Sequence, residues 1–296
     1  MKLEKSSFFN EIVRNITKQK SFTLTGLTTF SRLLLLKYIK EISNKKILFI
    51  TSTEQACLRY STDLDRLFNI NTFIIPYQSV SLYETITPNI YDYQKQVDIL
   101  RNRPEVVIAP AKVLLEKFPN DNFFEENRLS LKIGDSISQQ ELLKKLISLG
   151  YKRATMVSDM GEFSIRGDIS DIYTLKEKPV RIEFWGDEIV DIRFFDNESQ
   201  KSIEKIKEIE ILPLYKFILP KDAPKEFSLQ LKEQFDNEGY FEGINVYQSY
   251  FNSDLVSALD YFEDYIIIYD EIAEIFAKIN QVDVYVVFRT VFFALS

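Results

Sequence analysis

The residues with the clearest binding chemistry lie in one stretch of alternating sequence, KPVRIEFWGDEIVDIRFF, residues 178–195. Its polar positions carry arginines, acidic residues and the only tryptophan of the chain: Arg181, Glu183, Trp185, Asp191 and Arg193. Because alternate residues of a β-strand face opposite sides of a sheet, we expect an apolar core face and an outer face with these side chains. An exposed tryptophan beside arginines is typical of a protein–protein interface.

Two more arginines precede this stretch. Arg166 lies in FSIRGD on a predicted strand of the same module, and Arg153 lies near the beginning of the module. The alternative to a binding face is structural: Trp185 would cover a second layer of the protein, and the arginines would only balance neighbouring carboxylates. The alternation of residues leaves both interpretations open.

The turn between the two predicted strands fixes which residues pair. A two-residue Gly186-Asp187 turn would place Phe184 opposite Ile189 and put the apolar faces out of phase. We therefore predict a three-residue loop that also includes Glu188, with Phe184 opposite Val190. In this register the outer-face pairs are Arg181 with Arg193, Glu183 with Asp191, and Trp185 with Ile189.

Catalytic chemistry has little support in the sequence. The chain has no histidine and one cysteine, Cys57, which excludes histidine-based catalysis and histidine or cysteine-cluster metal sites. Strand alternation places the acids that could bind Mg²⁺ on different faces of a sheet: Glu162, Asp168, Asp171, Glu183 and Asp187. None of the eight glycines begins a phosphate-binding loop or a dinucleotide motif. We expect no catalytic residue, no cofactor and no metal.

The elements around these residues indicate an α/β fold. Short apolar strands are predicted at residues 21–25, 46–51, 71–75 and 105–108, with amphipathic helical stretches between them. This order is typical of a parallel sheet with helical crossovers. Gly26 follows the first strand, where a nucleotide-binding domain carries its phosphate loop, but the residues there are Gly26-Leu27-Thr28-Thr29.

The pattern changes at about residue 121 to a helix at residues 138–149 and then to alternating β sequence up to residue 195. A buried-strand pattern, DYIIIY at residues 264–269, returns later. The simplest fold is a parallel-sheet α/β domain interrupted by an inserted α+β module.

The charge distribution and the chain ends bear on localisation. Residues 1–50 carry ten lysines and arginines against three glutamates, although the net charge of the chain is −7. Solvated helix faces or contact with nucleic acid would both explain this basic end. Residues 1–20 lack the apolar core of a signal peptide, and the apolar tail at residues 282–295 is interrupted by Asp283 and Arg289. We expect a cytoplasmic protein without membrane contact.

The run at residues 161–202 resembles the damage-recognition adaptor module shared by bacterial transcription-repair coupling factors and the excinuclease component UvrB. Three motifs carry the resemblance, G-E-F-x-x-R-G, R-I-E-F-[FW]-G-D-E-I and F-D-x-x-[ST]-Q-[KR]-S, and the last one favours the coupling factor. Trp185 stands where the family more often has phenylalanine. Weaker similarity extends to about residue 280.

The resemblance implies a degenerate, helicase-like (RecA-like) domain without a phosphate loop, split by a module that binds the repair ATPase UvrA. The implied segments are 1–122 and 214–280 for the helicase-like domain, 123–213 for the UvrA-binding module and 281–296 as an unassigned tail. The family's contact residues correspond to Arg166, Arg181 and Trp185, with Glu183 and Arg153 as neighbours.

The resemblance therefore predicts a non-catalytic adaptor, the N-terminal part of a coupling factor. RNA polymerase and DNA would be contacted only through domains that lie further along in the family. Two alternatives remain: a nucleotide-dependent enzyme similar to UvrB or a helicase, and direct DNA binding by the basic N-terminal end.

Overall fold

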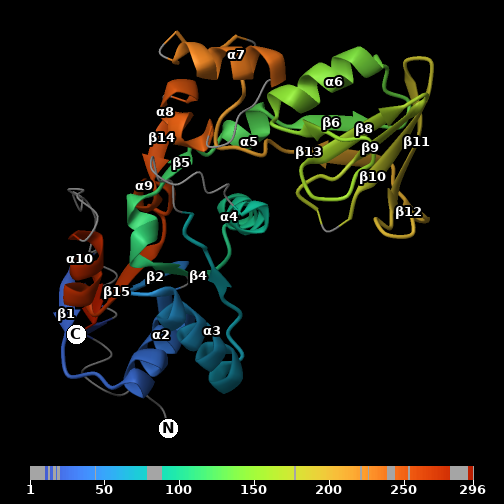
Figure 1. Ribbon diagram of the computed structural model, residues 1–296. Coiled ribbons are helices and arrows are strands. Elements are labelled where there is room, and N and C mark those ends of the chain that lie inside the picture. The colour runs from blue at the N-terminus through green and yellow to red at the C-terminus, as the bar shows by residue number, and fades with distance from the viewer. Residues whose placement is uncertain are drawn as a thin grey trace. The chain divides into compact units, whose positions relative to one another are not determined.

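The computed structural model describes residues 11–12, 14–15, 18, 21–43, 45–78, 89–176, 178–220, 222–225, 227–238, 244–252, 254–280 and 293–295. The chain forms two compact units, which differ in the type of their main sheet (Figure 1). The first unit consists of Met1–Gln78, Lys95–Phe118 and Val256–Ser296. The second consists of Ser79–Gln94 and Pro119–Leu255.

A six-stranded sheet, here called the parallel sheet, organises the first unit with the strand order β1-β16-β15-β2-β4-β3. In that order the strands are Phe22–Leu24, Phe293–Leu295, Ile266–Asp270, Ile47–Thr51, Val106–Pro110 and Phe73–Ile74. All of their pairings are parallel. Every residue of β2, β4 and β15 is buried, which fits their mostly apolar sequences, since a parallel sheet is covered on both faces. The prediction of a parallel α/β sheet is confirmed.

Helices cover this sheet. They are α2 (Thr29–Ser43), α3 (Glu54–Phe68), the 3-10 helix η2 (Ala111–Leu115), α9 (Ala258–Tyr261) and α10 (Ile272–Asn280), while α4 (Ile90–Asn102) begins in the second unit and ends in the first. Figure 1 shows α2 and α3 side by side beneath β2 and β4. Leu36 of α2 and Leu64 of α3 share one buried cluster with Phe49 of β2. This cluster is the part of the first unit's core that lies between the sheet and these two helices.

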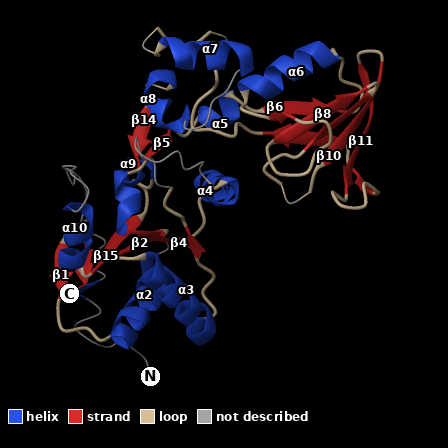
Figure 2. Ribbon diagram, viewed as in Figure 1, coloured by secondary structure: helices blue, strands red, loops and turns tan. Residues whose placement is uncertain are grey.

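A second six-stranded sheet, here called the hairpin sheet, forms most of the second unit with the order β12-β11-β10-β9-β8-β7. In that order the strands are Ser202–Lys205, Glu188–Phe195, Val180–Trp185, Ile169–Ile172, Glu162–Arg166 and Lys152–Arg153. The neighbouring pairs are antiparallel except β7 with β8. Figure 2 shows helix α6 (Gln139–Ser148) beside this sheet, and its Leu142 and Leu146 are fully buried. The residues of β10 alternate between buried and partly exposed up to Trp185, as the sequence predicts.

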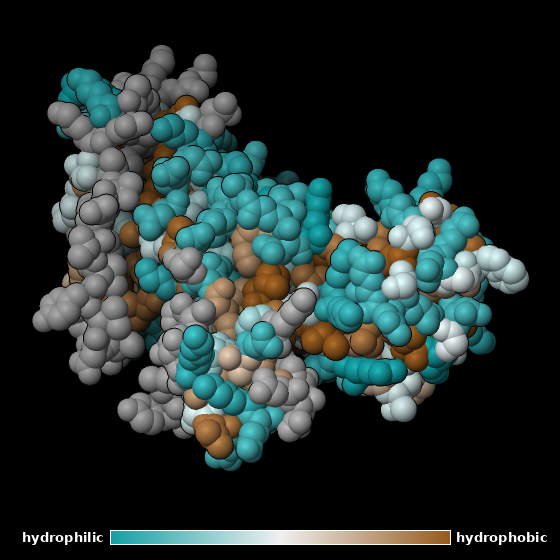
Figure 3. Space-filling model, turned by 90° about the horizontal axis from the view of Figure 1, so that it is seen from above, coloured by the Kyte–Doolittle hydropathy of each residue, from teal (hydrophilic) through white to brown (hydrophobic). Residues whose placement is uncertain are grey.

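The remaining elements of the second unit are α5 (Phe123–Glu126), a two-stranded sheet of β6 (Leu129–Lys132) and β13 (Glu208–Ile211), α7 (Leu229–Glu238), η3 (Ile244–Tyr247) and α8 (Gln248–Phe251). Strands β5 (Lys117–Pro119) and β14 (Leu255–Ser257) pair with each other. In the face visible in Figure 3, hydrophilic residues surround separate hydrophobic patches. Isolated exposed apolar residues are common on protein surfaces, so exposure alone does not identify a binding site.

Residues 214–255 belong to the second unit, whereas the resemblance implies that residues 214–280 complete the first. The segment packs around an aromatic core of its own, in which the Phe217 ring stacks on Tyr215 at 5.2 Å and on Phe251 at 4.8 Å. The backbone N–H of Leu214 also donates to the carbonyl of Leu149 at the end of α6, at 2.8 Å. These contacts hold the segment to the second unit up to Leu255.

Candidate protein-interaction face

Two cross-strand rows of residues, all polar except Ile169, run across one face of the hairpin sheet, here called the outer face. The first row follows successive pairings from β8 to β12: Ser164, Asp171, Arg181, Arg193 and Lys205. The second row contains Arg166, Ile169, Glu183 and Asp191. Because directly opposed residues of neighbouring strands project to the same face, the rows bring opposite charges into contact.

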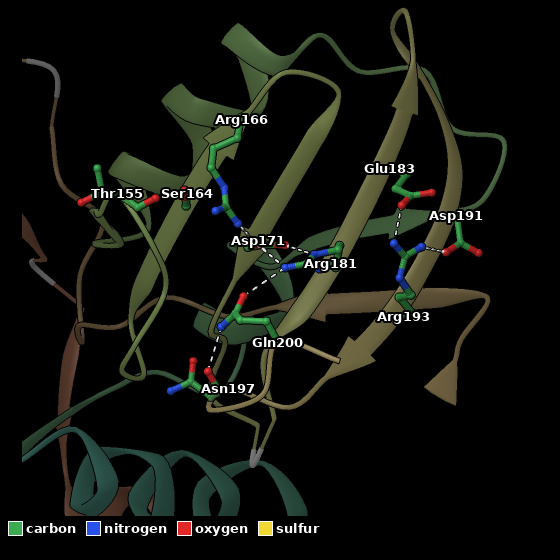
Figure 4. Close-up of polar contacts among 10 residues, drawn as sticks. All are labelled: Thr155, Ser164, Arg166, Asp171, Arg181, Glu183, Asp191, Arg193, Asn197 and Gln200. Atoms are coloured by element: carbon green, nitrogen blue, oxygen red, sulfur yellow. Dashed lines mark hydrogen bonds and ion pairs between the residues drawn. The ribbon is translucent and has the colours of Figure 1, made fainter. Parts of the chain in front are cut away.

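Asp171 is the centre of one ion cluster on this face (Figure 4). Its side chain is 1% exposed, and its two carboxylate oxygens accept hydrogen bonds from Arg181 Nε at 2.6 Å and Arg181 Nη2 at 2.8 Å. The Nη2 group of Arg166 donates to the same carboxylate at 2.8 Å. The bidentate pairing of the Arg181 guanidinium with the Asp171 carboxylate fixes the orientation of both groups.

Arg181 is held on further sides. Its guanidinium lies 4.5 Å from the centre of the Phe195 ring, and its Nη2 donates to Oε1 of Gln200 at 3.2 Å. Phe195 and Gln200 belong to the F-D-x-x-S-Q motif. The Asp196 carboxylate closes the turn of this motif by accepting hydrogen bonds from the Ser199 N–H at 2.8 Å and the Ser199 hydroxyl at 2.7 Å. Only 14% of the Arg181 side chain is exposed. This arginine is therefore mostly enclosed by its own module.

Arg193 is the centre of the second ion cluster. It donates to Glu183 and to Asp191, and Lys205 Nζ donates to Asp191 at 2.8 Å. The hydrogen bond from Arg193 lowers the pKa of Glu183, and the one from Lys205 lowers the pKa of Asp191. Both carboxylates are therefore held in the charged form.

Trp185 lies at the end of β10 and is 81% exposed. The pairs Arg181–Arg193 and Glu183–Asp191 form as predicted, but a β-bulge then shifts the register and places Phe184 opposite Ile189. The turn therefore has two residues, Gly186-Asp187, and the predicted three-residue loop is wrong.

The bulge explains how a two-residue turn is compatible with the apolar pattern. It inserts Val190, which is 46% exposed, and leaves Ile189 fully buried against the core. Trp185 lies opposite Glu188 instead of Ile189. Gly186 has φ 61°, a left-handed conformation that glycine adopts without steric cost.

The segment Gly134–Gln139, here called the strap, holds the two hairpin turns at this end of the sheet. The N–H of Ile137 donates to the carbonyl of Asp187 at 2.8 Å, and Gln139 Nε2 donates to the carbonyl of Gly167 at 2.6 Å. The first bond fixes the turn beside Trp185, and the second fixes the turn beside Arg166. Both side chains therefore project from anchored turns.

The five residues implied by the resemblance have different environments. Arg166 is half exposed, Trp185 is almost fully exposed, and Glu183 is partly exposed while paired with Arg193. Arg181 is mostly enclosed. Arg153 is exposed on the edge strand β7 opposite Phe163, and within the described residues it forms no ion pair with the acids of either cluster. The structure thus brings four of the five to the outer face.

Three residues of this face are not predicted from the sequence to contribute to it: Asp171, Phe195 and Gln200. In the sequence, Asp171 stands out only as an acid of a possible metal cluster. The signal that identifies it is its position on a strand between two arginine-bearing strands. Within the described part of the chain, no three acidic or cysteine side chains are grouped so that they could hold a metal ion.

The carboxyl edge of the parallel sheet is the other place where chemistry is expected, because ligands of α/β domains bind at this edge. Gly26 lies between β1 and α2, and the Thr28 hydroxyl accepts from the Ser31 N–H at 3.2 Å at the start of the helix. Arg32 of α2 donates to Asp270 at 2.8 Å and to Glu271, both at the end of β15. Burial raises the pKa of Asp270 despite this partner.

Other expectations concern the chain ends. Among the described residues, no helix combines the length and apolar character that crossing a membrane requires. Residues 1–10, which carry part of the basic end, and residues 281–292 of the apolar tail lie outside the described residues.

Comparison with known proteins adds the evolutionary relationship. Residues 129–217 match the model of the UvrB interaction domain family. Over 224 residues, 74% of this chain, it is 28% identical to a transcription-repair-coupling factor of Staphylococcus aureus (strain bovine RF122 / ET3-1). It is 29% identical to that of Staphylococcus haemolyticus (strain JCSC1435) over 73% of the chain. The matched part is 19% of the length of each relative.

The matched domain contains the outer face, both ion clusters and Trp185. The relatives match about three quarters of the chain, and they share a role in coupling transcription to DNA repair according to their name. Residues 129–217 thus match the UvrB interaction domain family, and about three quarters of the chain is similar to transcription-repair-coupling factors.

Proposed function

We propose that this chain recruits UvrA, the ATPase of nucleotide excision repair, through the outer face of its hairpin sheet. The presence of a UvrB interaction domain supports this partner. The observation that carries the proposal is Trp185: a large aromatic side chain, 81% exposed, at an anchored turn inside that domain. Aromatic anchors of this kind dominate the energy of many protein interfaces.

The two arginines have different roles in the proposal. Arg166 is half exposed and makes one hydrogen bond to Asp171, so it can bind a carboxylate or carbonyl of UvrA as well. Arg181 is enclosed by Asp171, Phe195 and Gln200 and mainly supports the face. Glu183 and Arg153 would be neighbours of these contact residues.

We also propose that the first unit is a helicase-like domain that does not bind nucleotide. In support of this, the loop at Gly26 has no lysine for the phosphates, and Arg32 from the following helix pairs with Asp270 at the sheet edge. The chain then acts as an adaptor without activity of its own. RNA polymerase and DNA would be contacted by other parts of a longer coupling factor, which works in the cytoplasm.

The first experiment is calorimetric titration of UvrA onto the wild-type chain, Trp185→Ala, Arg166→Ala and Leu229→Ala. Leu229 is the matched control because it is a large apolar side chain, 78% exposed, on α7. Loss of the aromatic anchor should weaken binding by about 2 kcal/mol, or about thirty-fold, whereas Leu229→Ala should bind like the wild type.

Equal affinities of all four proteins for UvrA would overturn the proposed binding face. A titration with Mg-ATP tests the alternative of a nucleotide-dependent enzyme. Binding of ATP with a micromolar dissociation constant would contradict the proposal that the first unit does not bind nucleotide.

A further inference from the structure

We propose that Asp171 is a positioning residue for partner binding, which acts by holding the Arg166 guanidinium on the outer face. This inference rests on the proposed function and adds a residue that does not itself reach the partner. The Asp171 side chain is 1% exposed, so a bound protein cannot contact it directly.

The first step of the argument is geometric. One carboxylate oxygen accepts from Arg181 Nε, and the other accepts from Nη2 of both Arg181 and Arg166. Arg181 and Arg166 reach Asp171 from the two strands that flank it, β10 and β8. A single buried carboxylate thus sets the positions of two arginines.

The second step concerns mobility. A free arginine side chain has many rotamers, and fixing it in an interface costs conformational entropy. Half of the Arg166 side chain is exposed, and Asp171 is its ion-pair partner. The bond to Asp171 offsets this cost before the partner arrives, and it leaves the other donors of Arg166 available.

The third step explains why Asp171 serves Arg166 more than Arg181. Arg181 keeps Gln200 and the Phe195 ring if the carboxylate is removed. In Asp171→Asn, the amide offers one acceptor oxygen where the carboxylate offers two. We expect Arg181, which makes two bonds to this group, to keep that oxygen and Arg166 to be released.

The test is a double-mutant cycle in UvrA binding. Asp171→Asn should weaken binding by about three-fold to ten-fold, the range expected for immobilising one long side chain. The loss should disappear in an Arg166→Ala background and persist in full in a Trp185→Ala background. A general distortion of the sheet would instead weaken binding in both backgrounds.

Three outcomes overturn the inference. The first is that Asp171→Asn binds UvrA as tightly as the wild type or more tightly. The others are that Asp171→Asn weakens UvrA binding in full in the Arg166→Ala background, or that it no longer weakens binding in the Trp185→Ala background. If Asp171→Asn does not fold, the charge-balanced variant Asp171→Ala/Arg181→Gln, which leaves no acceptor for Arg166 at position 171, replaces it and is compared with Arg181→Gln. It should bind UvrA three-fold to ten-fold more weakly than that single variant, and equal affinity would contradict the inference.

Failure of the proposed function has a different signature, because the wild-type chain would then not bind UvrA at all. In that case ¹⁵N relaxation of Arg166 Nε in the free chain still tests the positioning role. Greater mobility of Arg166 in Asp171→Asn than in the wild type is expected, and unchanged mobility would refute it.

Discussion

Each unit of the molecule contains arginine side chains paired with a buried carboxylate. The pair of Arg32 and Asp270 in the first unit and the cluster around Asp171 in the second differ in the exposure of their side chains. In the first unit, the side chains of Arg32 and Asp270 are only 12% and 7% exposed. In the second unit, Asp171 is equally buried, but Arg166 remains 50% exposed and Trp185, at the same end of the sheet, is 81% exposed. The same ion-pair chemistry therefore leads to two different surfaces.

Under the proposed function, one type of contact would serve stability in the first unit and recognition in the second. Arg32 links α2 to the strand β15, which lies more than two hundred residues away in the sequence, and its Nη1 and Nη2 donors are taken by Asp270 and Glu271. At the outer face the buried pair of Asp171 and Arg181 supports side chains that remain accessible. We expect substitutions of the buried Arg32, Asp270 and Arg181 to act on stability, and substitutions of the exposed Arg166 and Trp185 to act mainly on binding.

The largest effect is expected from Arg32→Met. It leaves the Asp270 carboxylate buried without its cation, which typically costs about 3–5 kcal/mol. Hydrogen exchange of the β15 amides measures this loss within the first unit. Lys37→Met on the same helix is the control, because Lys37 pairs with Glu41 at an exposed site and should matter by less than about 0.5 kcal/mol. Equal protection of β15 in both variants would remove the distinction between the clusters.

A smaller loss of stability is expected from Arg181→Met. Asp171 loses a bidentate partner but keeps Arg166, so a cost of about 2 kcal/mol is expected. It should appear as faster hydrogen exchange in β9 and β10. The control is Lys205→Met, which removes a cation that is 77% exposed. If the control lowers protection as much as Arg181→Met, the buried pair is not the support of the face.

Acidification should affect the two units in opposite directions. The pKa of Asp270 is raised by burial above its ordinary 3.8, so its charged form destabilises the fold, and this cost is relieved as the pH falls from neutrality through the raised pKa. The pKa values of Glu183 and Asp191 are lowered from 4.5 and 3.8, so the stability they add is present above those values and is lost as the pH falls below them. Hydrogen exchange measured at several pH values, corrected for the intrinsic exchange rates, reports the stability of each unit. A change of the same sign in β15 and β11 would contradict this pattern.

The smallest effect on stability is expected from Trp185→Ala. A side chain that is 81% exposed contributes little to the core, so the free energy of unfolding should change by less than about 0.5 kcal/mol. Chemical denaturation followed by circular dichroism measures it. A loss above about 1 kcal/mol would favour the structural interpretation, in which Trp185 covers part of the protein.

The sequence predicts the parallel sheet and the outer face of β10 because both depend on local hydrophobic patterns. The buried strand β2 is an unbroken apolar run, and Arg181, Glu183 and Trp185 alternate with buried residues. The same alternation places Trp185 on the outer face, while its exposure is known only from the structure. These features need no knowledge of distant contacts.

Other features depend on contacts that a pattern does not contain. The bulge at Val190 lets a two-residue turn keep the faces in phase, and alternation alone does not distinguish it from a longer loop. The enclosure of Arg181 requires the Phe195 ring and Gln200 to come together in space. Likewise, residues 214–255 join the second unit through backbone hydrogen bonds from Leu214 and Leu219 to the end of α6, which no local pattern shows.

The most direct test of the binding face uses the single tryptophan of the chain. Labelling with 5-fluorotryptophan gives one ¹⁹F NMR resonance, which belongs to Trp185 and reports its surroundings when unlabelled UvrA is added. We predict that this resonance shifts or broadens until UvrA saturates the chain, and that acrylamide quenches the bound tryptophan less than the free one. An unchanged resonance and unchanged quenching, at UvrA concentrations where calorimetry shows binding, would contradict the assignment of this face as the contact surface.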